Sequence, residues 1–226
     1  MNRLKRRSSR RRTVLILSSA ALVAGVPLLA ACGTSAHPGA AAVVGGKRIS
    51  VSSLQAQVNA VRTAQKASPQ AATLISNSAQ LNQAKLNGMI FDRVLDRAAK
   101  DAGVSATRHE VQVARQRAAA GQPGGEKQLE ATLLQQAAIT PGQIDGAVRR
   151  DVLMSKVAKA VGGDTTTPAG QQKLLTALTK ASKELNVDVN PRYGTWSDTK
   201  VALGNTKTDW IKQVTQQAKQ QEPTGA

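Results

Sequence analysis

The sequence predicts a mainly α-helical protein, an elongated helical core with a small β element formed by an early hairpin and a late strand. Apolar residues recur every three or four positions through most of the chain beyond residue 50, as on the buried face of a helix. Serine and threonine residues stand where these segments begin, and their hydroxyls can cap a helix. The apolar residues are largely alanine, leucine and valine, which suits close helix packing.

The early hairpin comes first among the elements. Ala42-Val43-Val44 and a return to Ile49 flank Gly45-Gly46, a pattern typical of two strands joined by a tight turn. A hairpin alone is marginally stable in water and leaves an open edge. The late strand at residues 186–190 has no neighbouring strand in sequence. We therefore expect Val43-Val44 or Arg48-Ile49 to pair with Val187-Asp188-Val189, which would bring the two ends of the core together.

Helix starts between these strands are marked by repeated capping patterns. A hydroxyl can accept from an orphan amide, and proline at the first helical position has no amide to satisfy. These patterns are Ser50, Ser68-Pro69, Thr107 with Glu110, Thr140 with Gln143, and Thr167-Pro168. With the apolar spacing they predict helices over residues 51–67, from 69 onward, and over 81–99, 108–120, 126–138, 143–161 and 171–185.

The helix predicted over residues 81–99 has the widest apolar face. Leu86, Ile90 and Val94 repeat at a spacing of four, and Met89 widens the face. Packing in the core is the simpler interpretation. The alternative is that Leu86, Met89, Ile90 and Val94 line a groove that binds unfolded polypeptide clients.

Residues 1–31 have the parts of a secretory signal. Residues 2–12 carry seven arginines and lysines and no acid, residues 13–31 are mainly apolar, and small residues end the segment. A transmembrane helix is the alternative, because the apolar run is nearly long enough to span a bilayer. Pro27 and the small residues around Cys32 count against it. Ser9-Arg10-Arg11-Arg12 leaves twin-arginine export open beside the general secretory route.

Cys32 is the only cysteine of the chain and closes Leu29-Ala30-Ala31-Cys32. This sequence resembles the lipobox of bacterial lipoproteins. The resemblance implies a diacylglycerol on the Cys32 thiol, cleavage before Cys32, and a lipid anchor on the outer face of the cell membrane. A free structural cysteine is the alternative, but Gly33-Thr34-Ser35 resembles a flexible tether. We expect that tether to cover residues 32–41.

Charge restricts the partners of the exported chain. The formal net charge of +17 becomes +10 when the seven charges of residues 2–12 leave with the signal. A moderately basic protein attracts anionic lipid headgroups, cell-wall polymers or acidic polypeptides. Nucleic acid is not expected as a partner, because the protein is exported and its 2% aromatic content offers little for bases to stack on.

No residue set in the sequence predicts catalysis. His37 lies in the tether, and His109 lies in a first helical turn where exposure is expected. Asp92 and Asp96 share a helix face, but the arginines beside them indicate a solvated charged surface. The glycine-rich residues 121–125 lack the preceding strand and lysine of a phosphate loop. We therefore expect no catalytic residue, no metal and no cofactor.

Residues 86–161 resemble the amino-terminal domain of SurA-type extracytoplasmic chaperones and PrsA-type foldases. The resemblance is carried by Leu86-x-x-x-Ile90-x-x-x-Val94-Leu95, Ala98-x-x-x-Ala102-Gly103-Val104-Ser105, His109-Glu110-Val111, Ile139-Thr140-Pro141 and Ala147–Leu153. It extends upstream to residues 42–50 and downstream to 187–196. It implies a chaperone domain over residues 42–196, with unfolded or secreted polypeptides as partners, followed by a polar tail over residues 197–226 with a possible helix near residues 210–219.

Members of this family often carry a parvulin-type prolyl isomerase domain between the helical core and the closing strand. Only residues 162–166 fill that position here, whereas an independent domain needs at least roughly 50 residues. The sequence therefore predicts a holdase without enzymatic activity. The alternative is a scaffold lipoprotein that binds one folded partner. A holdase should expose a large apolar patch, and a scaffold a smaller one.

Overall fold

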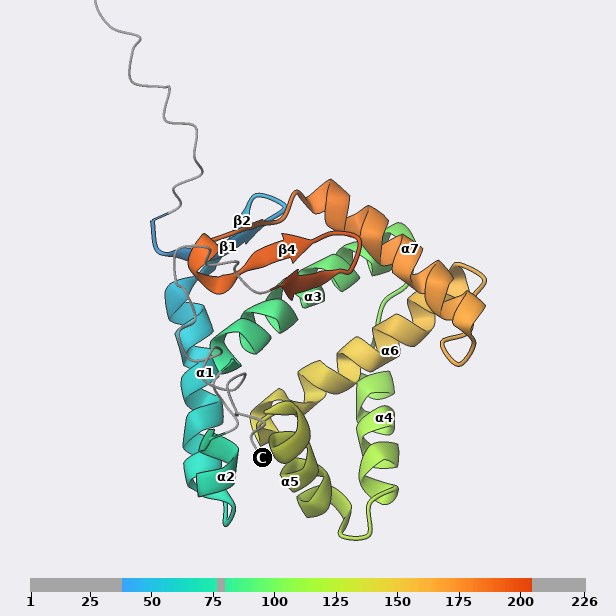
Figure 1. Ribbon diagram of the computed structural model, residues 1–226. Coiled ribbons are helices and arrows are strands. Elements are labelled where there is room, and N and C mark those ends of the chain that lie inside the picture. The colour runs from blue at the N-terminus through green and yellow to red at the C-terminus, as the bar shows by residue number, and fades with distance from the viewer. Residues whose placement is uncertain (1–37, 77–79, 205–226) are drawn as a thin grey trace, which may run out of the picture. The chain divides into compact units, whose positions relative to one another are not determined.

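The computed structural model describes residues 38–76 and 80–204, which all belong to one compact unit of the chain (Figure 1). Within these ranges the protein is mainly helical, as predicted. Its elements are, in chain order, β1 (Ala40–Val44), β2 (Lys47–Ser50), α1 (Val51–Lys66), α2 (Ala71–Ser76), α3 (Leu81–Asp101), α4 (Arg108–Ala120), α5 (Gly125–Ala137), the 3₁₀ turn η1 (Pro141–Gln143), α6 (Ile144–Ala160), α7 (Pro168–Leu185), β3 (Asp188–Val189), the 3₁₀ turn η2 (Pro191–Tyr193), β4 (Thr195–Ser197) and β5 (Ala202–Gly204).

Helix α3 is the element on which most of the others pack. It contacts α1, α6, α7 and β1, whereas α4 packs on α6 and α5 packs on α4 and α1. Its buried residues follow the predicted spacing and continue into Leu95 and Ala98. The main core therefore runs along α3, between the sheet and α7 on one side and α6 on the other, and a smaller cluster of Val111, Ile144 and Val148 joins α4 to α6.

Three of the predicted caps start helices as expected. Ser50 accepts from the amide of Ser53 at 3.0 Å at the start of α1. The capping box of Thr107 and Glu110 starts α4. Thr167 accepts from the amide of Gly170 at 3.1 Å, with proline next in sequence, and starts α7.

The prediction at Ser68-Pro69 was wrong in position. The Ser68 hydroxyl accepts from the amide of Gln70 at 3.2 Å, and the Ser68 carbonyl accepts from the amide of Ala71 at 3.1 Å, so residues 68–71 form a turn before the helix. Helix α2 begins at Ala71 and is only 6 residues long. A side chain that bonds within its own turn competes with helix formation, which explains the delay.

The two ends of the core meet in one sheet, as predicted. Strand β1 is central, with β2 on one side and β3 on the other, both antiparallel. Ala42 lies opposite Val189 and Val43 opposite Asp188. The amide of Asn190 extends the ladder by donating to the carbonyl of Ala41 at 3.0 Å. The late strand thus occupies the edge that the hairpin leaves open.

Both predicted limits of the chaperone domain need correction. Ala40 and Ala41 are buried in β1, so the tether does not extend to residue 41. Residues 197–204 are not a loose tail, because β4 and β5 form an antiparallel hairpin and Val201 enters the core with 5% of its surface exposed. The possible helix near residues 210–219 falls outside the described residues.

Among the described residues, none of the helices combines the length and the apolar character needed to cross a membrane.

Candidate functional site

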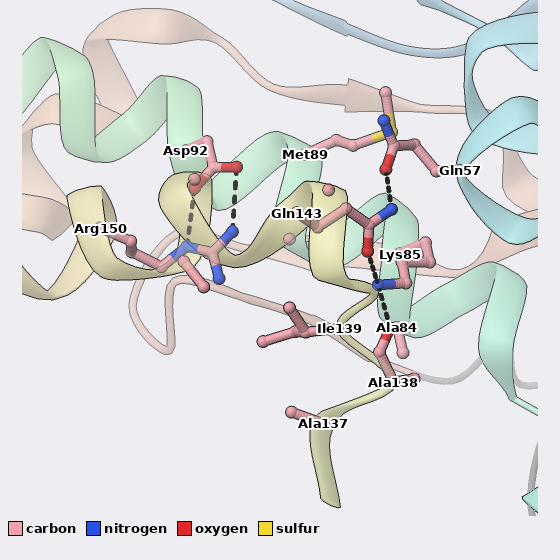
Figure 2. A pocket seen from close by; sticks show the side chains of 14 residues that line it. Gln57, Ala84, Lys85, Met89, Asp92, Ala137, Ala138, Ile139, Gln143 and Arg150 are labelled. Carbon is pink, nitrogen blue, oxygen red and sulfur yellow. Dashed lines mark hydrogen bonds and ion pairs between the residues drawn. The ribbon is translucent and has the colours of Figure 1, made fainter. Parts of the chain in front are cut away.

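The candidate site is a cavity of about 430 Å³ beside the first half of α3 (Figure 2). Helix α6, its 3₁₀ turn η1 and the end of α5 form the opposite wall, and α1 contributes one glutamine. The lining residues are Gln57, Ala84, Lys85, Gly88, Met89, Asp92, Ala137, Ala138, Ile139, Gly142, Gln143, Gly146, Ala147 and Arg150.

Much of the cavity wall is backbone and small side chains. Three glycines and four alanines line it, together with the larger apolar groups of Met89 and Ile139. A Cβ built on Gly142 or Gly146 would meet no heavy atom within 4 Å. A ligand can therefore approach the backbone closely along this wall.

Lys85 holds one end of the cavity together. Its Nζ donates to the carbonyl of Ala138 at 2.6 Å and to Oε1 of Gln143 at 3.0 Å. Ala138 ends α5 in the left-handed conformation, with φ of 52°. Gln143 in turn donates to Oε1 of Gln57, so α1, α3 and the segment between α5 and α6 are linked by one chain of hydrogen bonds.

Lys85 is half-buried, and its pKa is lowered to about 8. Burial is the larger cause, because it removes water from the ammonium, and the positive charge of Arg150 is the second. Both effects make the charged form of Lys85 less stable in this cavity than an ammonium group is in water.

Arg150 and Asp92 form the other polar wall. The Nε and Nη2 atoms of Arg150 donate to the two Asp92 oxygens at 2.7 and 3.0 Å. This two-point contact raises the pKa of Arg150. One helical turn further on, Asp96 pairs with Arg149 at 2.8 Å. The expected charged face is confirmed, because the Asp92 and Asp96 side chains remain 44% and 49% exposed, and in addition both carboxylates tie α3 to α6.

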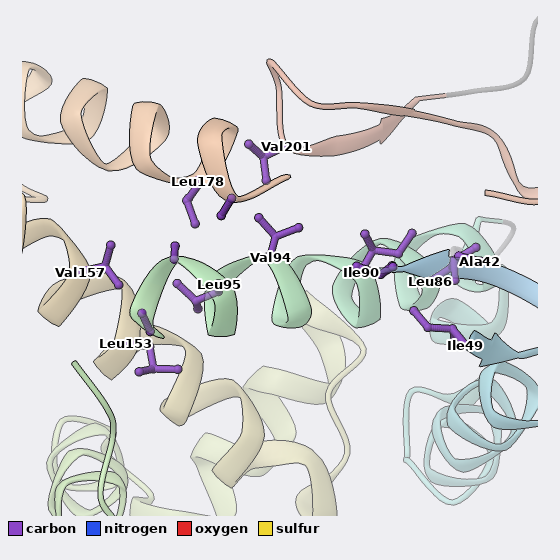
Figure 3. Close-up of a cluster of buried hydrophobic side chains, with 14 of the residues drawn as sticks. Ala42, Ile49, Leu86, Ile90, Val94, Leu95, Leu153, Val157, Leu178 and Val201 are labelled. Atoms are coloured by element: carbon purple, nitrogen blue, oxygen red, sulfur yellow. The ribbon is translucent and has the colours of Figure 1, made fainter. Parts of the chain in front are cut away.

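Three of the four predicted client-binding residues lie in the core. Leu86, Ile90 and Val94 are 0% exposed, and Figure 3 shows them among buried side chains of the sheet and of neighbouring helices. They cannot contact a client in this conformation, so their assignment to a client surface is corrected to core packing. Met89 is half-buried and lines the cavity.

Cys32 and His109 were also considered as functional positions in the sequence. Cys32, the predicted lipidation residue, lies outside the described residues. His109 is exposed, as expected. In the described part of the chain, no group of three or more histidine, cysteine, aspartate or glutamate side chains could hold a metal ion.

Sequence reasoning missed Lys85 and Arg150 as cavity residues. Arg150 belongs to an arginine pair within the segments that carry the family resemblance, and that pair could have indicated a functional position. No sequence pattern indicated Lys85, because its hydrogen-bond partners lie more than 50 residues away in the chain.

The structure is a mainly helical domain with a cavity between α3 and α6, in which the early hairpin and a late strand pair in one sheet. A family model described as the SurA-like N-terminal domain matches residues 4–158, which is more than half of the chain. The chain belongs to this chaperone-type family, whose domain binds polypeptides. Neither curated proteins nor solved structures yield a match to the chain. Helix α7 and strand β3 lie beyond the matched residues, yet they complete the core and the sheet.

Proposed function

We propose that this protein is a lipid-anchored extracytoplasmic chaperone that holds unfolded or secreted polypeptide segments in the cavity between α3 and α6. The observation that carries the proposal is that cavity, in a chain that belongs to a chaperone-type family. Its volume of about 430 Å³ lies within the range of small-ligand pockets. It suits a short stretch of extended chain with small or medium side chains.

The wall chemistry supports a polypeptide as the ligand. Met89 is flexible and polarizable, so it can adapt to different apolar side chains. The glycine and alanine surface lets a second backbone come close, and the amide of Gln57 can bond to peptide groups. This combination gives contact without strong selection for one sequence, as a holdase requires.

The lipid anchor rests on the residues before the described domain. The Leu29–Cys32 motif follows a basic and then an apolar segment. More than one acyl chain at Cys32 would give stable attachment, whereas a single chain gives marginal binding. The protein would then act on the outer face of the cell membrane, where secreted polypeptides emerge.

A non-enzymatic role is supported by the connection between α6 and α7. Only residues 161–167 separate these helices, and this is where related proteins often carry an isomerase domain. Val161 and Gly162 already bond back to the end of α6, and Asp164 bonds to Thr166 and Thr167. The linker is a folded turn.

A scaffold that binds one folded partner is the second candidate. It is favoured by the surface of the described residues, where Ile75 is the one large apolar residue that is clearly exposed, at 45% of its surface. A holdase with a broad apolar patch would expose more. Under our proposal the cavity takes the place of that patch.

A cavity-filling variant tests the proposal. Gly146→Leu adds a side chain to open space at the cavity wall and improves helix propensity by about 1 kcal/mol, so folding should be retained. We expect the full-length protein in nanodiscs to suppress aggregation of an unrelated unfolding protein, and Gly146→Leu to lose most of that effect. Ala118→Leu, an exposed position on α4 outside the cavity, is the matched control and should behave as the wild type.

The same assay separates the two candidates. The scaffold would be favoured if the wild-type protein did not suppress aggregation of several unrelated unfolding proteins but did bind one folded protein from its own membrane. If Gly146→Leu and the wild type suppressed aggregation equally well, the cavity would not be the binding site for unfolded polypeptides.

A further inference from the structure

Lys85 is a half-buried cation whose partners are all neutral. Its Nζ donates to the Ala138 carbonyl and to the Gln143 side-chain oxygen. No ion pair in the described part of the chain includes Lys85. An ammonium group has three donors, so one remains for a further acceptor.

The charges around the cavity do not balance. Of the described residues that line it, Lys85 and Arg150 are cationic and Asp92 is the single acid. Asp92 gives both of its oxygens to Arg150. The charge of Lys85 is therefore left without a counter-charge, and an unpaired charge removed from water is unfavourable.

Space for an acceptor exists next to these groups. Lys85 and Arg150 both border the cavity, and Figure 2 shows Lys85 beside Gln143 and Ala138, with Arg150 held by Asp92. Gly142 and Gly146 leave the opposite wall open to a ligand backbone. An anionic group on a polypeptide can thus enter without displacing a side chain that is already paired.

We propose that the cavity between α3 and α6 binds polypeptide segments through a carboxylate, which forms an ion pair with Lys85 in the field of Arg150. The inference rests on the proposed chaperone function and adds the chemistry of the segment that is held. The carboxylate can come from an aspartate or glutamate side chain or from the carboxyl terminus of a chain. Both sources present the same group, and the experiment below separates them.

Binding of matched peptides tests the inference. Three short fluorescent peptides would share one sequence of small apolar residues. The first carries a central glutamate and an amidated end, the second a central glutamine and a free carboxyl end, and the third a central glutamine and an amidated end. Fluorescence anisotropy with the full-length protein in neutral-lipid nanodiscs gives the three dissociation constants.

At least one carboxylate peptide should bind about tenfold more tightly than the neutral peptide at low salt, as for a partly buried charge-assisted pair. Whichever peptide gains identifies the source of the carboxylate. The gain should shrink as salt is raised. In Lys85→Met the carboxylate peptides should bind no better than the neutral one.

Lys100→Met is the matched control, because it removes the same charge from an exposed position on the same helix, outside the cavity. It should retain the tenfold gain. An equal loss in both variants would overturn the inference in favour of net charge. Since Lys85→Met also removes two hydrogen bonds, a second measurement on the wild type is needed. A bound carboxylate should raise the pKa of Lys85 from about 8, which the pH dependence of its acylation by acetic anhydride reports through mass spectrometry.

The outcomes separate this inference from the proposed function. If neutral and carboxylate peptides bind equally well, the carboxylate site is wrong and polypeptide binding stands. If no peptide binds the wild type, both are wrong. A pKa of Lys85 that does not change with the carboxylate peptides bound would place the peptide away from Lys85 and overturn the inference alone.

Discussion

Val43 of β1 and Asp188 of β3 lie directly opposite each other, although they are 145 positions apart in the chain. Within residues 38–76 and 80–204, every α-helix lies between these two strands. The pairing therefore closes one loop around the described helices, and its formation brings the beginning and the end of the helical core together. Long-range closure of this kind carries a large entropic cost that the native contacts have to offset.

Asn190 should stabilise this strand pairing. Its side chain donates to the Ala40 carbonyl at 3.3 Å and accepts from the amide of Arg192 at 3.2 Å. We expect Asn190→Ala to lower the free energy of unfolding by about 1–2 kcal/mol, since two hydrogen bonds are lost. Urea denaturation measures the change. Asp188→Asn, at an exposed position on β3, should stay within about 0.5 kcal/mol of the wild type.

Larger deletions extend the same prediction. Removing residues 187–196 should destabilise the core as a whole, because β3 and the start of β4 are lost. Removing residues 206–226 should cost little. The reverse order of melting temperatures would contradict this account of the core.

Ser182 should be another sensitive position. It is 0% exposed, accepts from Nε1 of Trp196 at 2.8 Å and bonds to Oδ1 of Asp198 at 2.5 Å. Ser182→Ala leaves an indole N–H and a carboxylate oxygen without this partner, so we expect a loss of about 1–3 kcal/mol. Thr176→Ala on the same helix removes an exposed hydroxyl that donates to the carbonyl of Gln172 at 2.9 Å, and it should stay within about 0.5 kcal/mol of the wild type. Equal effects of the two changes would argue against a role for this buried link.

Glu110 should make the protein sensitive to acid. Its pKa is lowered to about 2, first by the hydrogen bond from Lys156 and then by those from Thr107. Because the folded state lowers the pKa below the usual 4.5, this group stabilises the fold above about pH 4.5. The contribution should be lost progressively as pH falls toward 2.

The comparison with Glu110→Gln isolates this contribution. The difference in unfolding free energy between wild type and variant should be greatest at neutral pH and vanish toward pH 2. Thermal melts over that pH range measure it. A difference that stays constant from neutral pH to pH 2 would show that the carboxylate charge is not responsible.

Cys32 should decide the location of the protein. Cys32→Ser removes the thiol that would carry the proposed lipid, so we expect uncleaved precursor or protein released from the membrane. Fractionation and mass spectrometry of the mature amino terminus measure both results. Normal cleavage together with unchanged membrane retention would contradict lipid anchoring.

The purified protein should not catalyse prolyl isomerisation. The residues between α6 and α7 form a short turn. Family members that have an isomerase domain often carry it at this position. A proline-peptide assay should match the slow uncatalysed rate, which is intrinsic to the X-Pro bond. A catalysed rate that survives stringent purification would contradict the non-enzymatic assignment.

The sequence by itself determined most of the helices. Capping hydroxyls at Ser50, Thr107 and Thr167 and the apolar spacing of α3 act over one or two turns, so they can be interpreted without knowledge of the fold. The pairing of β1 with the late strand was also predictable, because an open edge and a lone strand each need a partner. Of the predicted client-binding residues, only Met89 lines the cavity.

Only the tertiary structure decided the rest. An apolar stripe does not say which of its members will be covered, and packing of α6, α7 and the sheet buries Leu86, Ile90 and Val94 completely. The cavity and its charges also arise between segments distant in sequence. Asp92 meets Arg150 across 58 positions, and Lys85 meets Ala138 across 53. Electrostatic pairing depends on distance in space, which local sequence patterns do not encode.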